Sequence, residues 1–76
     1  MGIEFYWHIM TDAWKLLKKY YDQAVSTNAA TEDEAWKWWL EQLTPEANAM
    51  TEKYNNPFCK KIVLAVMGAL EAEGKR

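Results

Sequence analysis

The fold is decided by the stretch NNPFCKKIVLAVMGAL, residues 55–70, because it holds both a helix start and the most apolar run of the chain. Asn56 is a favoured N-cap residue, and Pro57 suits the first helical position, where its missing N–H costs no hydrogen bond. A core stripe then follows at helical spacing, formed by Cys59, Val63, Val66 and Leu70. Because residues 62–70 are apolar on nearly every face, the sequence predicts a central helix over about residues 57–73.

The middle of the chain predicts two short helices that meet at a proline. Thr31 and Glu34 match a capping box, which places a helix start near residue 32. An apolar face then recurs at helical spacing, formed by Trp36, Leu40, Leu43, Ala47, Met50 and Tyr54. Pro45 falls within this series, and a proline inside a helix costs about 3 kcal/mol. With Thr44 as an N-cap, we expect helices over about 32–43 and 45–54, bent against each other.

The first part of the chain predicts one long helix over about residues 3–25. Apolar residues recur there at alternating spacings of three and four, namely Ile3, Tyr6, Met10, Ala13, Leu17, Tyr20 and Ala24. Two alternatives stay open: the first ten residues also alternate like a strand, and Thr11–Asp12 also fits a new N-cap. The expected fold is all-α, a single domain over residues 1–76 built as a bundle of three to four helices.

Composition excludes several classes of protein. With 76 residues, a formal charge of −2 and 14% aromatic residues, neither a disordered tail nor broad binding to a nucleic-acid backbone is expected. One cysteine excludes an internal disulfide framework, and one histidine excludes the usual zinc ligand sets. The start of the chain lacks the features of a signal peptide, and the apolar run 62–70 is too short to cross a bilayer. We therefore expect a cytoplasmic protein with Cys59 reduced.

The small size of the chain predicts self-association. A chain of 76 residues buries too little apolar surface to be more than marginally stable alone. Gly68 within a helix costs about 1 kcal/mol relative to alanine, which a close helix contact would justify. Leu64 and Met67 lie away from the helix face that runs through Phe58 and Ala65, so a monomer would expose them. We therefore expect a homodimer whose interface includes Leu64, Met67 and Gly68.

Catalytic chemistry has little support in the sequence. Nucleophilic catalysis needs a nucleophile held against a base, and nothing in the sequence brings His8 and Cys59 together. Cys59 lies near a helix start, where the dipole lowers a thiol pKa, but it also lies on the core stripe, so we expect a buried structural thiol. Glu4 and His8 share a helix face, yet the sequence offers no further His or Cys ligand beside them. We expect a protein without enzymatic activity, cofactor or metal.

The aromatic residues are the feature that most needs a function. Three of the five tryptophans fall within four residues: Trp36, Trp38 and Trp39. At 100° per residue they span about 300° of a helix surface, so one core face takes at most two of them. A second set of rings repeats every seven residues: Trp7, Trp14 and Tyr21. The plain alternative is that a small chain fills its core with large side chains, but we favour at least one exposed aromatic patch, because such patches mark interfaces.

Two groups of lysines suggest a second kind of binding site. Lys15, Lys18 and Lys19 share one flank of the first predicted helix, and Lys60 with Lys61 begins the last. Lysines at a helix start interact unfavourably with the helix dipole, so Lys60 and Lys61 are expected to have a functional role. Together with nearby rings they would frame a pocket for a nucleotide, although solvated surface lysine is the more common case.

Two segments, WKLLKKY (residues 14–20) and YNNPFCKKIVLAV (residues 54–66), resemble small uncharacterised proteins of Firmicute phages and prophages. The resemblance covers most of residues 13–71 and includes a middle helix that carries tryptophan. Thr44–Pro45 and the aromatic first ten residues depart from that pattern. The resemblance implies a small phage accessory protein, and many such proteins bind and block host immune machinery.

The resulting hypothesis is a dimeric, non-enzymatic phage accessory protein that acts in the cytoplasm of the bacterial host. It would bind and block a host defence protein, such as a CRISPR effector. The expected anchors are the aromatic residues Trp7, Trp14, Trp38 and Trp39. An acidic edge would steer the protein toward basic surfaces, and it is formed by Glu32, Asp33 and Glu34. The alternatives are a protein that sequesters a nucleotide signal between rings and lysines, and a structural or regulatory phage component.

Overall fold

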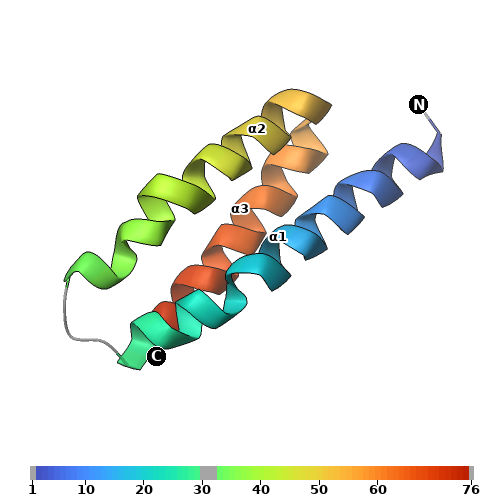
Figure 1. The fold of residues 1–76 in the computed structure, drawn as a ribbon. Coiled ribbons are helices and arrows are strands. Elements are labelled where there is room, and N and C mark those ends of the chain that lie inside the picture. Colours follow the sequence, from blue (N-terminus) through green and yellow to red (C-terminus); the bar gives the residue numbers. More distant parts are fainter. Residues whose placement is uncertain (1, 30–32, 76) are drawn as a thin grey trace.

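The computed structural model describes residues 2–29 and 33–75, which fold into a small all-α bundle. The helices are α1 (Ile3–Ala29), α2 (Thr44–Tyr54) and α3 (Pro57–Gly74), and α2 is preceded by a 3-10 turn (Asp33–Trp36) and a π-helical turn (Trp39–Leu43). Figure 1 shows α1 and α3 running in the same direction, with the chain from residue 33 to α2 returning in the opposite direction. The bundle measures 45 × 18 × 16 Å.

Helix α1 is longer than predicted, and its buried face coincides only in part with the predicted one, at Ala13, Tyr20 and Ala24. It begins at Ile3, so the strand alternative and a fresh start at Asp12 are both wrong, and it continues to Ala29 rather than residue 25. Its buried side chains are Ile9, Ala13, Leu16, Tyr20, Ala24 and Thr27. The predicted core residues Ile3 and Met10 are instead 81% and 46% exposed.

The chain passes through Pro45 without the predicted break. Thr44 is not an N-cap, because Leu43 and Thr44 both have right-handed helical backbone. The Thr44 N–H and, at 2.7 Å, the Thr44 hydroxyl both donate to the Trp39 carbonyl five residues earlier. A proline ring clashes with the carbonyl four residues before it, and the wider π turn at this point relieves the clash.

The π turn also changes which residues face the core. The extra residue in the turn rotates the preceding segment relative to α2, so Leu40 is 73% exposed although the sequence placed it on the apolar face. Leu43, Ala47 and Met50 of that face are buried, as predicted. The proposed capping box rests partly on Thr31, which lies outside the described residues.

Helix α3 confirms the prediction from local sequence. Asn55 ends α2 in the left-handed conformation, at φ 43°. Asn56 follows with extended backbone, and its side-chain oxygen accepts the Phe58 N–H at 2.8 Å, so it is the N-cap before Pro57. The predicted core stripe is buried along its whole length, at Cys59, Val63, Val66 and Leu70.

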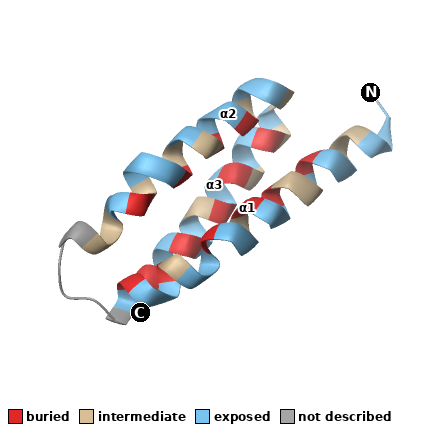
Figure 2. Ribbon diagram, viewed as in Figure 1, coloured by how far each residue is buried: buried red, intermediate tan, exposed pale blue. Residues whose placement is uncertain are grey.

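The core lies where the three helices meet. Figure 2 shows buried residues recurring at intervals along each helix, with exposed residues between them. The closest helix pair is α1 with α3. Within the described ranges, no helix is both long and apolar enough to span a bilayer.

Candidate functional site

One side of α1 is apolar yet lies outside the core. We call it the outer face of α1, and it consists of Ile3, Trp7, Met10, Trp14, Leu17, Tyr21 and Val25. At 100° per residue these positions share an arc of about 80°, centred about 110° from the centre of the buried face. Trp7 and Trp14 are 58% and 62% exposed, and only Leu17 is partly covered by the core. The prediction of at least one exposed aromatic patch is therefore confirmed, and this patch lies on α1.

The middle of the outer face is hollowed. A cavity of about 550 Å³ lies among Trp14, Leu17, Lys18, Tyr21 and Asp22. Two aromatic rings and one aliphatic side chain thus surround it, with one cation and one anion at its edge. Such a hollow accepts an apolar side chain from another molecule, as binding pockets for anchor residues do.

Aromatic contacts hold the start of α1 against the other helices. Tyr6 meets Phe58 of α3 edge to face at 5.1 Å between ring centres, and Phe5 meets Tyr54 of α2 at 5.8 Å. The Tyr54 hydroxyl donates to the Asp12 carboxylate, and this hydrogen bond, aided by burial, raises the pKa of Tyr54 to about 12. Trp7 is therefore presented on a helix that is fixed from behind.

The tryptophan cluster, Trp36, Trp38 and Trp39, lies at the other end of the bundle and faces inward. Trp38 is 7% exposed and lies between Tyr20 and Trp36, stacked on each at 5.8 Å. Trp39 is partly buried and meets both neighbours edge to face. The prediction that Trp38 is an exposed anchor is wrong, because its ring fills the space beneath the end of α1.

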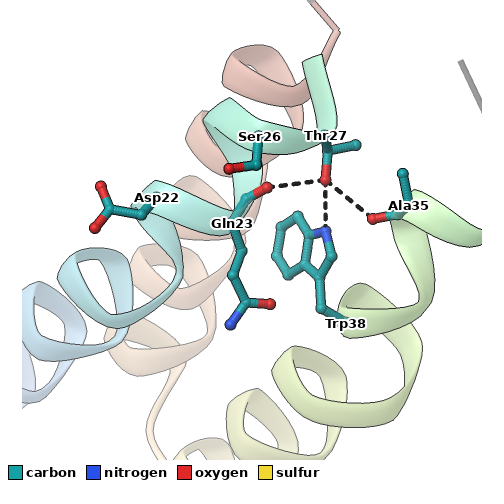
Figure 3. Close-up of a pocket in the computed structure, with 6 residues that line it drawn as sticks. All are labelled: Asp22, Gln23, Ser26, Thr27, Ala35 and Trp38. Atoms are coloured by element: carbon teal, nitrogen blue, oxygen red, sulfur yellow. Dashed lines mark hydrogen bonds between the residues drawn. The ribbon is translucent and has the colours of Figure 1, made fainter. Parts of the chain in front are cut away.

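A buried threonine explains how the polar edge of Trp38 is accommodated. The Trp38 indole N–H donates to the Thr27 hydroxyl at 2.8 Å (Figure 3). The Thr27 hydroxyl in turn donates its own proton, which the Gln23 carbonyl at 2.9 Å and the Ala35 carbonyl at 3.0 Å share. Thr27 was not among the predicted residues, although it continues the helical spacing of the buried residues Tyr20 and Ala24.

A second, smaller hollow borders the tryptophan cluster. Trp36, Trp39 and Leu40 line a cavity of about 400 Å³ with the side chains of Glu71 and Lys75. Trp39 thus lines a hollow at the surface and is half-buried, whereas Trp38 is 7% exposed. Of the acidic edge proposed for steering, Asp33 and Glu34 belong to the 3-10 turn, and Glu32 lies outside the described residues.

The predicted dimer residues on α3 occupy mixed positions. Leu64 is 68% exposed, whereas Met67 is partly buried against the core. Both line a groove of about 240 Å³ between α2 and α3, together with Lys60. Gly68 is exposed, and a methyl group added there would meet nothing within 4 Å. No contact with residues 2–29 or 33–75 therefore explains this glycine in the middle of α3.

The structure distributes the lysines over separate surfaces. Lys15 and Lys19 line a groove between α1 and α2, where Lys19 pairs with Glu46. The hydrogen bond from Lys19 is the main reason why the pKa of the Glu46 carboxyl is lowered. Lys18 borders the hollow of the outer face instead, and Lys60 lies in the α2–α3 groove. Lys61 is exposed and lines none of these three surfaces.

Cys59 is a core residue, as predicted. Its side chain is fully buried, and its thiol lies 3.7 Å from the Met50 carbonyl. Burial raises the pKa of the thiol, which disfavours the thiolate that a nucleophile needs. His8 is exposed on α1 beside the Trp7 ring. Among the described side chains, no three His, Cys, Asp or Glu residues gather as a metal site would require.

Comparisons with protein-family models, with curated proteins and with solved structures found no match for this chain. The candidate function therefore follows from the surface itself, and the outer face of α1 is its most distinctive feature.

Proposed function

We propose that this chain is a non-enzymatic interaction protein that binds a partner protein through the outer face of α1. One observation carries the proposal: an apolar stripe with two tryptophans, each more than half exposed, runs along a helix whose separate buried face is fixed in the core. Soluble proteins rarely expose contiguous apolar patches of this extent unless the patch binds something.

The energetics of this face fit an interaction site. Covering about 100 Å² on each indole ring contributes about 2.5 kcal/mol at ~25 cal/mol per Å². Tryptophan and tyrosine are also the residues that most often dominate binding energy at interfaces. Trp7 and Trp14 would therefore be the main anchors, and the hollow beside Trp14 would receive a side chain of the partner.

The biological partner that we propose is a host defence protein, such as a CRISPR effector, bound and blocked in the bacterial cytoplasm. This choice of partner rests on the resemblance of residues 14–20 and 54–66 to phage proteins. A rigid helix face blocks a partner by occupying its surface, without chemistry on either side. The partner should accordingly offer an apolar groove or a helix with an apolar stripe.

Capture from a bacterial lysate with matched variants tests this proposal. The wild-type chain and Leu64→Lys, which places a charge on the exposed side of α3, should retain the same partner. Trp14→Lys should lose it, because a charge then occupies the centre of the outer face. Retention of the partner by Trp14→Lys would contradict the proposal, provided that circular dichroism shows an unchanged helix content.

One observation favours a second candidate function, the sequestration of a nucleotide signal. The hollow of the outer face places Lys18 beside Trp14 and Tyr21, which is the combination of a cation and stacking rings that binds bases and phosphates. A thermal melt with added cyclic dinucleotides tests it, since a bound ligand raises the melting temperature. A shift that Lys18→Gln abolishes would favour this function over protein binding.

A further inference from the structure

The outer face of α1 has the internal order of a coiled-coil seam. Trp7, Trp14 and Tyr21 repeat every seven residues, and Ile3, Met10 and Leu17 form a second series with the same period. The two series interleave at spacings of four and three, which is the heptad pattern of a helix that pairs with another helix. Because the buried face of α1 already serves the core, none of the helices within residues 2–29 and 33–75 pairs with this seam.

The alternation of large and smaller side chains selects the orientation of the pairing helix. In a parallel pair of identical helices each ring would meet the same ring, and each aliphatic residue the same aliphatic residue. In an antiparallel pair each ring meets an aliphatic residue, so every layer of the seam has about the same width.

One antiparallel register pairs every ring of the seam with an aliphatic residue of the second copy. In it Trp7 lies opposite Leu17 of a second copy, Trp14 opposite its Met10, and Tyr21 opposite its Ile3. Within each pair the two residue numbers add up to the same total, which is the condition for one antiparallel alignment to form all three pairs. All three layers therefore form together. The two-fold axis of such a dimer passes near residue 12 of α1, where both copies contribute equally.

The charges beside the seam support the same register. Glu4 and Lys18 are exposed and lie on the same edge of the outer face, the edge away from α3. In the antiparallel register Lys18 of the second copy is two residues, or about 3 Å along the axis, from the position opposite Glu4. Two opposite-charge pairs therefore form per dimer, whereas in a parallel pair the two copies of this edge lie on opposite sides of the seam and form neither pair.

The other edge of the seam also suits the approach of a second molecule. Because Tyr6 contacts Phe58, the face of α3 that carries Phe58, Ala65 and Ala69 borders the outer face of α1. Ala65 and Ala69 are exposed, and small side chains let a neighbouring helix come close.

The area of the seam matches a stable interface. From their exposed fractions, its residues present about 600 Å² of surface, mostly apolar, and the flanking residues add to this. A standard protein interface takes about 800 Å² from each partner. Covering the outer face on both copies would bury about 1,200 Å² in total, which is the lower end of the range for specific protein interfaces.

We infer that a second copy of this chain occupies the outer face of α1, in an antiparallel homodimer with Trp14 opposite Met10 and Glu4 beside Lys18 of the other copy. The inference rests on the proposed function, because it assigns an occupant to the same binding face. A foreign partner then competes with the second copy, and dimer dissociation controls when the face is available. The expected dimer seam is therefore on α1 rather than at Leu64, Met67 and Gly68 of α3.

Charge exchange tests the register on the intact chain. Sedimentation equilibrium at low salt should show a dimer for the wild type. Lys18→Glu alone and Glu4→Lys alone should each raise the dissociation constant about tenfold, because two attractive pairs per dimer become repulsive. The double variant Glu4→Lys/Lys18→Glu should restore the wild-type value. Both residues are exposed, so circular dichroism should show the same fold for all four proteins.

Several outcomes would overturn the inference. A wild-type monomer at millimolar concentration excludes the dimer, and a dimer that Leu64→Lys dissociates while Lys18→Glu does not places the interface on α3. A dimer that both single charge variants leave unchanged excludes the antiparallel register. These failures can be told apart from failure of the proposed function. If the wild-type chain is a monomer but Trp14→Lys still abolishes capture of the lysate partner, the outer face of α1 remains the binding face, and only the second copy is excluded as its occupant.

Discussion

Two regions of this protein are rich in tryptophan, and the fold treats them in opposite ways. The tryptophan cluster at residues 36–39 turns inward, with Trp38 stacked between two rings and 7% exposed. The outer face of α1 keeps Trp7 and Trp14 more than half exposed. The difference does not lie in the side chains. It lies in what the rest of the chain places opposite them.

Among the residues that the structure describes, the inward cluster has a polar partner on α1, namely Thr27. Thr27 at the end of α1 accepts the Trp38 indole N–H, so this ring is buried without leaving a donor unpaired. Trp7 and Trp14 are each more than half exposed, so solvent or another molecule contacts much of their surface. Tryptophan in the first region therefore stabilises the fold, and tryptophan in the second is available for binding.

The largest test of this contrast replaces one ring from each region by alanine. Trp38→Ala should lower the free energy of unfolding by about 3 to 5 kcal/mol, because it removes a buried ring and leaves a cavity. Trp14→Ala should change it by less than about 0.5 kcal/mol, because the ring is exposed. Urea denaturation at a protein concentration low enough to keep the chain monomeric measures both values. Equal losses would mean that the outer face is part of the folded core.

The second test compares two adjacent tyrosines in alkaline solution. Tyr20 is buried in the core against Trp38, and this burial, with the nearby Glu46 carboxylate, raises its pKa from 10.0 to about 12. Tyr21 lies on the outer face and is 45% exposed. Because the pKa of Tyr20 is higher in the folded than in the unfolded state, its contribution to stability is complete below pH 10 and is lost as the pH rises from 10 to 12.

The loss amounts to about 2 to 3 kcal/mol for a shift of two pKa units. Tyr20→Phe should therefore flatten the fall in stability across this pH range, and Tyr21→Phe should leave it as in the wild type. Urea midpoints measured at several alkaline pH values, with tyrosinate absorbance, provide the comparison. The opposite ranking of the two variants would place Tyr20 at the surface.

The third test removes the polar partner of the inward cluster. Thr27→Val keeps the shape of the side chain but leaves the Trp38 N–H and the Ala35 carbonyl without the hydroxyl, at an expected cost of about 1 to 3 kcal/mol. Thr27→Ser keeps the hydroxyl and should cost less. Should the valine variant match the wild type in chemical denaturation, the hydrogen bond would not explain why Trp38 is buried.

The local signals in the sequence predicted part of this fold well. Asn56, Pro57 and the stripe from Cys59 to Leu70 predicted α3, because capping and helical spacing depend only on nearby residues. The continuous helical backbone across Pro45 could not be predicted from local signals in the same way. It depends on a π turn, in which Thr44 bonds to Trp39, and helix propensity does not reveal this change of register.

The orientation of α1 was missed for a specific reason. This helix carries two apolar stripes of similar spacing, and the predicted core stripe lies between them. Ala13, Tyr20 and Ala24 belong to the buried face, whereas Ile3, Met10 and Leu17 belong to the outer face. Only the packing of α3 and α2 decides which stripe is covered, and that information is not local. The same holds for Trp38, whose burial depends on Thr27, eleven residues away.

The test with the smallest expected effect asks whether α3 contacts a helix of a second copy at Gly68. Gly68 is exposed in the middle of the helix, and a methyl group there has open space around it. Gly68→Ala should therefore stabilise the chain by up to about 1 kcal/mol through helix propensity alone. For a domain of this size that gain raises the melting temperature by about 4 to 8 °C. Sedimentation equilibrium should show no change in self-association, because the seam that we propose lies on α1. A variant that melts higher but dimerises less would instead show that Gly68 admits a second helix at this point, and it would move the interface from α1 to α3.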